Sequence, residues 1–225
     1  MFPAAIETER LRLERFDHEH VDPFELYEVT SASENETVWQ YVPWEPYETV
    51  YEAAEYVDDV VERWEDGETA EYVVRPRQGA ADAGAFAGVT LLDVEWDRRS
   101  GQIAIWLARR FWGRGYSEER TTALLALAFD RLDLEVVEVT HNVENDKSRQ
   151  AIEKYVDRFG GRREGVLRNF LAYGDTVSDE VRYTISREEW IENRPDDLGV
   201  ELVDDPADGD DGSADADDDL RGGDR

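Results

Sequence analysis

The sequence predicts one mixed α/β domain whose first half is an antiparallel sheet and whose second half alternates strands with helices. Three observations support this fold class. The 225 residues are enough for one large domain. Apolar runs in the first half are joined by a hairpin loop, and from residue 102 onward the apolar pattern reads strand, helix, strand, helix, strand. We therefore expect a folded domain over residues 1–195, followed by a disordered acidic tail over residues 196–225.

The chain begins with an expected strand and two expected helices. Residues 9–15 alternate polar and apolar side chains, as a half-buried strand does. Asp22 followed by Pro23 is typical of a helix start, with a capping residue before proline. The next helix begins at a capping-box pattern over residues 49–52 and ends before Gly67. Its apolar stripe contains Ala53, Tyr56, Val57, Val60, Val61 and Trp64.

The central part predicts three strands and a helix. Residues 71–75 and 86–92 predict a hairpin whose loop covers residues 79–84. Residues 102–107 predict a strand that runs directly into a turn containing glycine. A helix is expected after that turn, over residues 117–130.

Two strands and a second helix complete the expected domain. The run at residues 136–140 is too apolar for an edge strand. A helix begins after Asn145, and residues 182–185 predict the last strand. The folded part should end near Arg194. The expected inward-facing side chains of the second helix are Ile152, Tyr155, Val156 and Phe159.

The chain is strongly acidic, with 55 acidic and 25 basic residues and a net charge of −30. Residues 196–225 carry 13 acidic and 2 basic residues, so residues 1–195 retain a net charge of −19. Lys147 and Lys154 are the only lysines. Such a surface suits a halophilic cytoplasm, because molar salt shortens the Debye length to ~3 Å. An acidic surface that binds a basic partner is the alternative interpretation. Direct binding of nucleic acid is disfavoured, because phosphate contacts need basic residues.

Composition also excludes several classes of protein. The sequence contains no cysteine, which excludes disulfides, thiolate metal sites and a cysteine nucleophile. It has no apolar run of ~18 residues that could span a membrane. Its first residues show no basic stretch followed by an apolar stretch. We expect a cytoplasmic protein that needs no metal, and the sequence leaves its oligomeric state open.

The most informative segment is the turn after the strand at residues 102–107. Gly113 and Gly115 allow the backbone to turn closely before a long helix begins. The free amides and the positive dipole end of that helix can hold a phosphate or pyrophosphate. Arg109, Arg110 and Arg114 add positive charge. The segment lacks the Gly-Lys-Ser/Thr end of a P-loop, and Glu118 replaces the third glycine of a dinucleotide fingerprint. An ordinary tight turn is the alternative interpretation.

Several motifs in order resemble the GCN5-related N-acetyltransferases. Arg110-x-x-Gly113-x-Gly115 is similar to the family's (Gln/Arg)-x-x-Gly-x-(Gly/Ala) signature, whose loop amides hold the pyrophosphate of acetyl-CoA. Other segments resemble the RimJ/RimL group, which acetylates the N-termini of ribosomal proteins. These segments are Thr8-Glu9-Arg10-Leu11-Arg12-Leu13, Trp112-Gly113-Arg114-Gly115-Tyr116, Asn145-Asp146-Lys147-Ser148-Arg149 and Glu164-Gly165-x-x-Arg168, with Asp179 and Tyr183 closing the series.

The resemblance implies an acyl-CoA N-acyltransferase fold with acetyl-CoA as co-substrate. The residues that it assigns to acetyl-CoA binding are Leu107, Arg109, Arg110, Trp112, Gly113, Arg114, Gly115, Tyr116, Ser117 and Asn145. Two departures from the family are visible. Residues 155–161 extend the second helix where the family has a short Leu-Gly-Phe end. Leu171 stands where some members place a carboxylate base.

The resemblance also implies that the Ser148 hydroxyl protonates or hydrogen-bonds the sulfur of CoA, and Tyr155 is the rival acid. Each residue also has a structural alternative. Ser148 would hydrogen-bond the amides of the first helical turn, and Tyr155 would be a core residue. His141 is a candidate base or a structural histidine, and Gln102 cannot be a base, so the base stays unassigned. Trp44 and Tyr47 are candidates to line the acceptor pocket, or core residues.

We therefore predict an N-acetyltransferase that transfers acetyl from acetyl-CoA to a primary amine, with a protein or peptide α-amine as the first candidate. A small amine, such as a polyamine or an amino sugar, is the alternative acceptor. A regulatory module that binds CoA without catalysis is the third interpretation, because of Leu171.

Overall fold

A computed structural model describes residues 1–42, 44–173 and 176–204 of the chain. Within these residues one sheet has the strand order β7-β8-β6-β5-β4-β3-β2-β1-β9. All neighbouring strands are antiparallel except β5 and β6, which are parallel. The strands are β1 (Ala5–Glu7), β2 (Leu11–Arg15), β3 (Thr69–Pro76), β4 (Gly88–Glu95), β5 (Ser100–Leu107), β6 (Val136–Asn142), β7 (Arg162–Tyr173), β8 (Thr176–Ser186) and β9 (Glu201–Val203). This mixed sheet confirms the predicted fold class.

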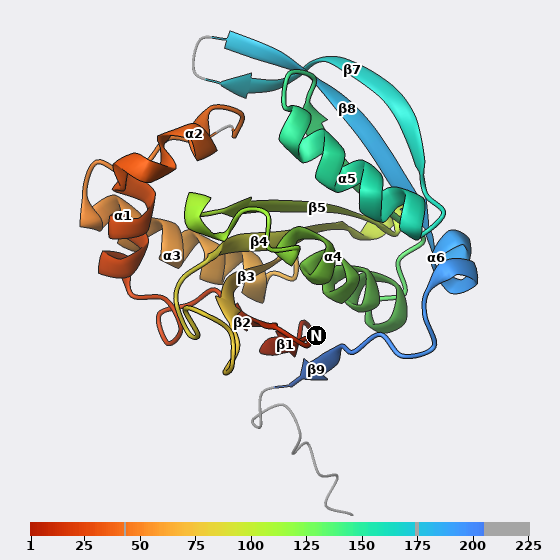
Figure 1. Cartoon of the computed structure of the whole chain (residues 1–225), viewed down its shortest axis with the longest axis horizontal. Helices are drawn as coiled ribbons and strands as arrows, with labels where there is room; N and C mark the ends of the chain where they lie inside the picture. The colour runs from red at the N-terminus through yellow and green to blue at the C-terminus, as the bar shows by residue number, and fades with distance from the viewer. Residues whose placement is uncertain (43, 174–175, 205–225) are drawn as a thin grey trace, which may run out of the picture.

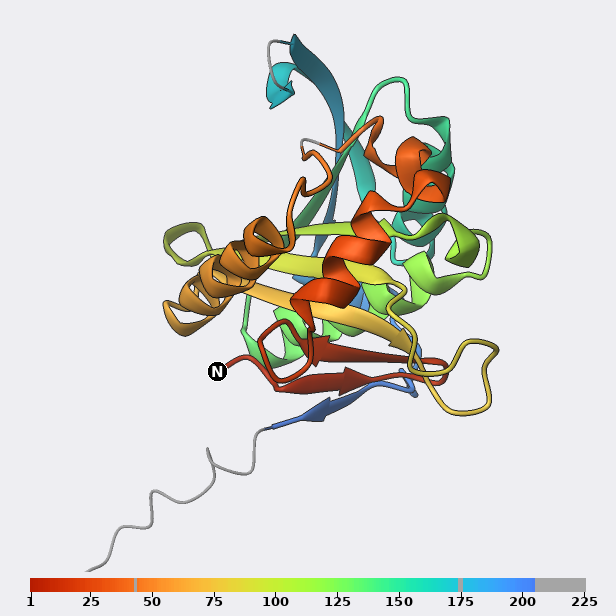
Figure 2. The ribbon, with the colours of Figure 1, turned by 90° about the vertical axis from the view of Figure 1, so that its left-hand side faces the viewer.

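Helices cover both faces of the sheet. The α-helices of the described residues are α1 (Pro23–Ser31), α2 (Glu36–Trp39), α3 (Val50–Glu65), α4 (Tyr116–Ala126), α5 (Asp146–Arg158) and α6 (Arg187–Asn193). In Figure 1, α4 and α5 lie side by side on the face of the sheet that is turned to the viewer. Figure 2 shows α1 and α3 on the opposite face. The sheet is therefore the middle layer of three.

The predicted helix starts are confirmed, with one difference in chemistry. Asp22 caps α1 by accepting a hydrogen bond from the Phe24 amide at 2.9 Å. Thr49 caps α3 in the same way, but the Glu52 carboxylate accepts from the Glu48 amide rather than from Thr49. The Thr49 half of the capping box is therefore present. The Glu52 half bonds the amide of the residue before Thr49 instead of the Thr49 amide.

Alternation along the strands assigns each side chain to one layer. Directly opposite residues on neighbouring strands share a face. Glu71 on β3, Leu91 on β4 and Ala104 on β5 are in register on the α3 face. The opposite face carries the larger core, in which Ile103 and Val137 pack under α4 and α5. Two separate apolar cores result, one on each side of the sheet.

Strands β5 and β6 separate soon after they meet. Their parallel pairing covers Ser100 to Gln102 on β5 and Val136 to Glu138 on β6. Beyond Gln102, β5 continues to Leu107 along β4 alone. The backbone groups of β5 that face β6 are therefore without a strand partner over the second half of β5. This gap opens at the carboxyl ends of the two strands, where the glycine turn follows.

The predicted end of the folded chain near Arg194 is wrong. Residues 201–203 form β9, which pairs with β1, and Leu202 packs against the main core. Arg131 also pairs with Asp204 at 2.8 Å. Residues 182–185 are consequently not in the last strand. Sequence reasoning overlooked β9 because three residues in an acidic segment are too few for a recognisable alternation. The rest of the predicted tail, residues 205–225, lies outside the described residues.

Two further strands were missing from the sequence prediction. Strand β1 has only three residues, and β7 over Arg162–Tyr173 is polar along much of its length. Within residues 1–42, 44–173 and 176–204, no helix combines the length and the apolar composition that crossing a membrane requires.

Candidate functional site

The glycine turn joins the end of β5 to the start of α4. Gly113 and Gly115 have φ values of 74° and 81°, a region that glycine enters without a steric penalty. Gly115 is the N-cap of α4, and no side chain in the described part of the chain caps the helix there. The buried ring of Tyr116 packs under Arg10, 5.4 Å from its guanidinium carbon, and Ser117 is half-buried. The first amides of α4 are available to an anion.

The two glycines of the turn have different surroundings. A Cβ atom built on Gly113 would meet no described atom within 4 Å, so the space beside this residue is open. A Cβ on Gly115 would lie 3.2 Å from Nη2 of Arg10. The two glycines therefore serve different purposes. Gly113 borders free space at the predicted cradle, whereas Gly115 allows a guanidinium to approach the backbone.

Positive side chains surround this turn in an acidic molecule. Arg109 and Lys147 lie on the ring of Trp112, at 5.1 Å and 4.4 Å from its centroid. Arg110 and Arg114 lie over Phe111. Arg114 also pairs with Asp82, but neither Arg110 nor Lys147 forms an ion pair with a described residue. The cluster brings the predicted cofactor residues Arg109, Arg110, Trp112 and Arg114 together at one end of the sheet.

The N-terminal motif holds the turn in place. Glu119 of α4 accepts hydrogen bonds from the Thr8 hydroxyl at 2.6 Å and from the Arg10 amide at 2.7 Å. The Arg10 guanidinium donates to Glu119 and to the carbonyl of Arg114. These contacts tie β2 to the first turn of α4. Sequence reasoning noticed Thr8 and Arg10 but did not identify Glu119 as their partner, because 109 residues separate it from Arg10.

The gap between β5 and β6 exposes a backbone donor near the turn. The Ala108 amide donates to Ala87 on the β4 side at 2.9 Å. Since amides alternate along a strand, the Leu107 amide points the other way, toward β6. Its carbonyl on the same side accepts from Trp112 Nε1 at 2.7 Å. Leu107 therefore offers an N–H group to the gap, where a backbone donor can polarise a carbonyl oxygen.

Helix α5 begins beside this gap with a conventional cap. Asn145 Oδ1 accepts from the Ser148 amide at 3.1 Å. Asn145 is thus the N-cap, and Ser148 is three residues inside the helix. The half-buried Ser148 hydroxyl has no hydrogen-bond partner among the described residues. The alternative that Ser148 serves as the cap is wrong, because Asn145 already fills that position.

Tyr155 lies two turns further along α5 and is completely buried. Its neighbour is the equally buried Arg120 of α4, whose positive charge opposes the effect of burial on the tyrosine. Burial dominates and raises the pKa of Tyr155 to about 12, so the hydroxyl stays protonated at neutral pH. Hydrogen bonds from Arg120 and Thr121 act on the Tyr155 hydroxyl in the same direction as the Arg120 charge.

His141 is placed in the core rather than on the open face. Its Nδ1 lies 2.8 Å from the Asn142 carbonyl oxygen, and its ring stacks near Tyr183. Burial lowers the pKa of His141, which favours the neutral ring. The structural interpretation of His141 fits these contacts.

The α3 face of the sheet is only partly covered. Ala104 is exposed and Leu91, Gln102 and Trp106 are half-buried, although all four lie on central strands. We call these four residues the open strip. On the other face the neighbouring Leu92 and Ile103 are fully buried. The open strip thus leaves room on the sheet next to the gap between β5 and β6.

Aromatic side chains border the open strip at the Trp106 end. The Trp39 and Trp44 rings lie 5.0 Å and 6.1 Å from Trp106, and Tyr47 lies 4.8 Å from Trp44. The predicted acceptor-side residues Trp44 and Tyr47 therefore meet at the open strip. The sequence alone could not distinguish this position from the core.

A buried carboxylate lies on the same face. Glu71 is fully buried on β3 and accepts a hydrogen bond from the Tyr56 hydroxyl at 2.7 Å. Burial raises its pKa to about 7, although Tyr56 and Arg63 act in the opposite direction. Sequence reasoning passed over Glu71. The available signal was a charged residue in the otherwise apolar run of residues 70–74.

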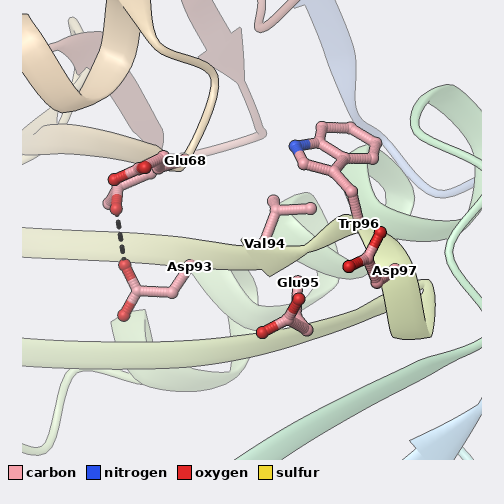
Figure 3. Close-up of a pocket in the computed structure, with 7 residues that line it drawn as sticks. Glu68, Asp93, Val94, Glu95, Trp96 and Asp97 are labelled. Carbon is pink, nitrogen blue, oxygen red and sulfur yellow. Dashed lines mark hydrogen bonds between the residues drawn. The ribbon is translucent and has the colours of Figure 1, made fainter.

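An acidic hollow lies at the other end of β3 and β4. Figure 3 shows Glu68, Asp93, Glu95 and Asp97 around Val94 and Trp96. Asp93 accepts a hydrogen bond from Thr69 at 2.7 Å, and Trp96 donates to the Gly67 carbonyl. Asp93 is in register with Gln102, so the hollow adjoins the open strip and adds negative charge there.

Comparisons with known proteins agree with this geometry. Residues 10–155 match the family model described as the acetyltransferase (GNAT) domain. A Bacillus subtilis (strain 168) protein named "Putative ribosomal N-acetyltransferase YdaF" is 31% identical over 108 residues. The match covers 48% of this chain and 57% of YdaF, so the chain spans little more than half of that relative.

Two solved structures share the fold. A GCN5-related N-acetyltransferase from Brucella melitensis superposes with a TM-score of 0.69 at 21% identity, over 83% of this chain and 80% of the other. RimL, described as a ribosomal L7/L12 α-N-protein acetyltransferase in complex with coenzyme A, has a TM-score of 0.67 at 18% identity. That match covers 80% of this chain and 95% of RimL. At such identities the likeness establishes the arrangement of strands and helices.

Proposed function

Since the chain belongs to the GNAT acetyltransferase family, we propose that it transfers an acetyl group from acetyl-CoA to the N-terminal α-amine of a protein or peptide. The observation that carries this proposal is the gap between β5 and β6. One end of the gap meets the free amides of α4, and its side adjoins the open strip. A phosphate-bearing acyl donor and an amine can therefore approach the same point from different directions.

The residues around the glycine turn fit the phosphates of acetyl-CoA. The amides from Gly113 to Ser117 and the side chains of Arg110 and Lys147 supply donors and positive charge. Asn145 caps α5, and its remaining hydrogen-bonding capacity can serve the pantetheine chain. When bound, acetyl-CoA supplies the activated acetyl thioester.

Catalysis in this arrangement depends mainly on positioning. The Leu107 amide donates a hydrogen bond toward the gap and would stabilise negative charge on a carbonyl oxygen there. Ser148 is the first candidate to protonate the departing sulfur, because its hydroxyl is half-buried and has no described partner at hydrogen-bond distance. Tyr155 is the second, since its hydroxyl is protonated at neutral pH but fully enclosed.

An α-amine fits the open strip for two reasons. The strip runs along central strands without a covering helix, so an extended peptide end has room on it. Asp93, at its acidic end, favours a cationic acceptor. YdaF and RimL, whose names refer to ribosomal-protein acetylation, agree with this choice.

The proposal is tested by measuring CoA release from acetyl-CoA with a panel of acceptors in molar KCl. The panel contains peptides with free N-termini, the same peptides with blocked N-termini, and polyamines. We expect turnover with free peptides and none with blocked ones. Preferential turnover of polyamines would assign the enzyme to small amines. Tight CoA binding without any turnover would instead indicate a regulatory module.

A further inference from the structure

Glu71 is a fully buried carboxylate on the same face of the sheet as the open strip. Its side chain is fully enclosed on β3, in register with Leu91 and Ala104. Ala104 is exposed and borders the gap between β5 and β6. Two strand spacings place the Glu71 backbone ~10 Å from that of Ala104. A glutamate side chain and one or two intervening hydroxyl groups or waters can span that distance.

We propose that Glu71 is the proton acceptor of acetyl transfer, taking the proton of the acceptor's ammonium group through the Tyr47 hydroxyl and intervening water. This inference rests on the proposed function, because it concerns the amine that the enzyme acetylates. Glu71 acts through other groups and does not touch the acceptor itself.

Aromatic residues connect the open strip to Glu71. Trp106 is a member of the strip, and Trp44 stacks on it with ring centroids 6.1 Å apart. Tyr47 follows Trp44 at 4.8 Å, and Tyr56 follows Tyr47 at 5.9 Å. The Tyr56 hydroxyl then donates to Glu71 at 2.7 Å. The chain of rings thus runs from the strip, beside the gap, to the carboxylate.

Tyr47 supplies a polar group between the open strip and Glu71. Its hydroxyl is buried, and Trp44 lies near enough to it for a hydrogen bond that acts against the rise in its pKa. It lies close enough to Glu71 for the carboxylate charge to raise the pKa of the Tyr47 hydroxyl further above its ordinary value, after burial itself. A tyrosine hydroxyl that accepts from Trp44 keeps its own proton to donate and a further lone pair, which an ammonium or a water at the strip can use.

The groups that face Glu71 have opposing effects on its pKa. From α3, the Tyr56 hydroxyl and the Arg63 guanidinium favour the ionised carboxylate, with Arg63 Nη2 at 3.4 Å. Burial has the largest effect and favours the protonated carboxyl, and the charge of Asp93 on β4 acts in the same direction. Tyr47 faces it from the loop before α3. The resulting pKa of Glu71, about 7, suits a group that must both accept and release a proton near neutral pH.

With Glu71 as proton acceptor, the protons and electrons of the reaction balance. Glu71 takes the first proton and leaves a neutral amine, whose nitrogen lone pair forms the new bond to the acetyl carbon. The carbon–sulfur bond breaks, and its electron pair leaves with sulfur. The second proton lost by nitrogen reaches that sulfur through Ser148, Tyr155 or solvent. Glu71 then releases its proton to solvent.

The first test is Glu71→Gln, which keeps the size and an acceptor for Tyr56 but cannot take a proton. We expect kcat with a peptide acceptor to fall ~10²-fold or more, while acetyl-CoA affinity measured by calorimetry stays within about twofold. Glu14→Gln is the matched control. Glu14 is a half-buried, ion-paired carboxylate on the adjacent strand β2, so its variant should retain full activity. Equal activity of the two variants would overturn the proposal.

The second test uses Tyr56→Phe, which removes the hydrogen bond to Glu71 without removing the ring. The lost bond raises the pKa of Glu71, so the acidic limb of the kcat profile should move to higher pH. The substrate amine is the same for both enzymes and cannot cause this shift. A limb that stays in place while the variant remains folded would show that Glu71 does not limit the reaction.

A third measurement does not depend on turnover. Infrared difference spectra of the wild-type chain should show a carboxylic-acid band that titrates near neutral pH and is missing in Glu71→Gln. If the wild type acetylates no amine in the panel, the proposed acceptor class fails, and this spectrum still tests Glu71. The absence of a band that titrates near neutral pH would overturn the assignment of Glu71 as a proton acceptor.

Discussion

Ser148 and Tyr155 lie on one helix but in different surroundings. Ser148 is half-buried at the first turn of α5, and Tyr155 is enclosed two turns later beside Arg120. Because Asn145 caps the helix, the Ser148 hydroxyl is not needed as a cap. The two residues can therefore be separated by measuring turnover and thermal stability in the same variants.

We expect Ser148→Ala to lower kcat by ~10²-fold with little change in melting temperature or in acetyl-CoA affinity. A lower melting temperature without a loss in rate would instead indicate a structural hydroxyl. Tyr155→Phe is the companion variant, because it keeps the ring and removes only the hydroxyl. A rate loss in that variant alone would make Tyr155 the acid.

Glu71 gives the folded state a pH dependence of its own. Its pKa is about 7 in the folded chain and 4.5 in the ordinary state, so the folded state holds a proton that the unfolded state has lost between these values. Stability therefore falls as pH rises from 4.5 to 7, by about 3–4 kcal/mol in all at ~1.4 kcal/mol per pH unit. Denaturant unfolding of wild type and Glu71→Gln at pH 5 and pH 8 checks this. The wild type should lose about 2–3 kcal/mol more than the variant, because pH 5 already lies inside this window.

At the scale of elements, the strand–turn–helix unit from β5 to α4 is held from outside by β2. Glu119 connects α4 to Thr8 and Arg10, and Arg10 reaches the carbonyl of Arg114 inside the turn. The open space beside Gly113 lies next to this clamp. The position of the cradle thus depends on residues more than one hundred positions apart.

We expect Gly113→Val to abolish measurable acetyl-CoA binding, because its side chain would fill the open space and its φ of 74° disfavours a β-branched residue. Calorimetry with a folded variant checks this. Glu119→Gln should weaken binding less, since the cradle would loosen but stay open. Unchanged affinity in folded Gly113→Val would disprove the assignment of the cradle.

The whole molecule includes a C-terminal segment that completes the sheet. β9 pairs with β1, and Arg131 holds Asp204. A chain ending after Asp204 should keep its melting temperature and activity. A chain ending at Arg194 loses β9 and exposes β1, so we expect a lower melting temperature. Thermal scans of the two truncated chains beside the full chain distinguish these outcomes, and equal melting temperatures would mean that β9 adds no stability.

The charge of the whole molecule leads to a second prediction. Residues 1–195 carry −19 without the tail, so their self-repulsion should be strong when salt is dilute. We expect the melting temperature to fall on transfer from molar to millimolar KCl, in both the full chain and the chain ending after Asp204. Equal stability in the two salts would contradict the interpretation of a surface suited to high salt.

The sequence by itself determined the order and type of the main elements and the position of the glycine turn. These elements follow from local patterns, which the sequence shows directly. The patterns are the alternating and helical apolar periods, the helix start at Asp22 and Pro23, and the cap at Asn145. The turn was identifiable for the same reason, since two glycines, basic residues and a helix start follow one another along the chain.

The tertiary structure alone decided which distant residues meet. Three-residue strands such as β9 form only because a partner edge is available, and no period in the sequence marks them. The bond between Glu119 and Thr8, the contact of Arg120 with Tyr155, and the enclosure of Glu71 beneath Tyr56 all join separate elements. Burial and charge at these positions depend on packing, which is why the candidate proton acceptor could be identified only in the folded chain.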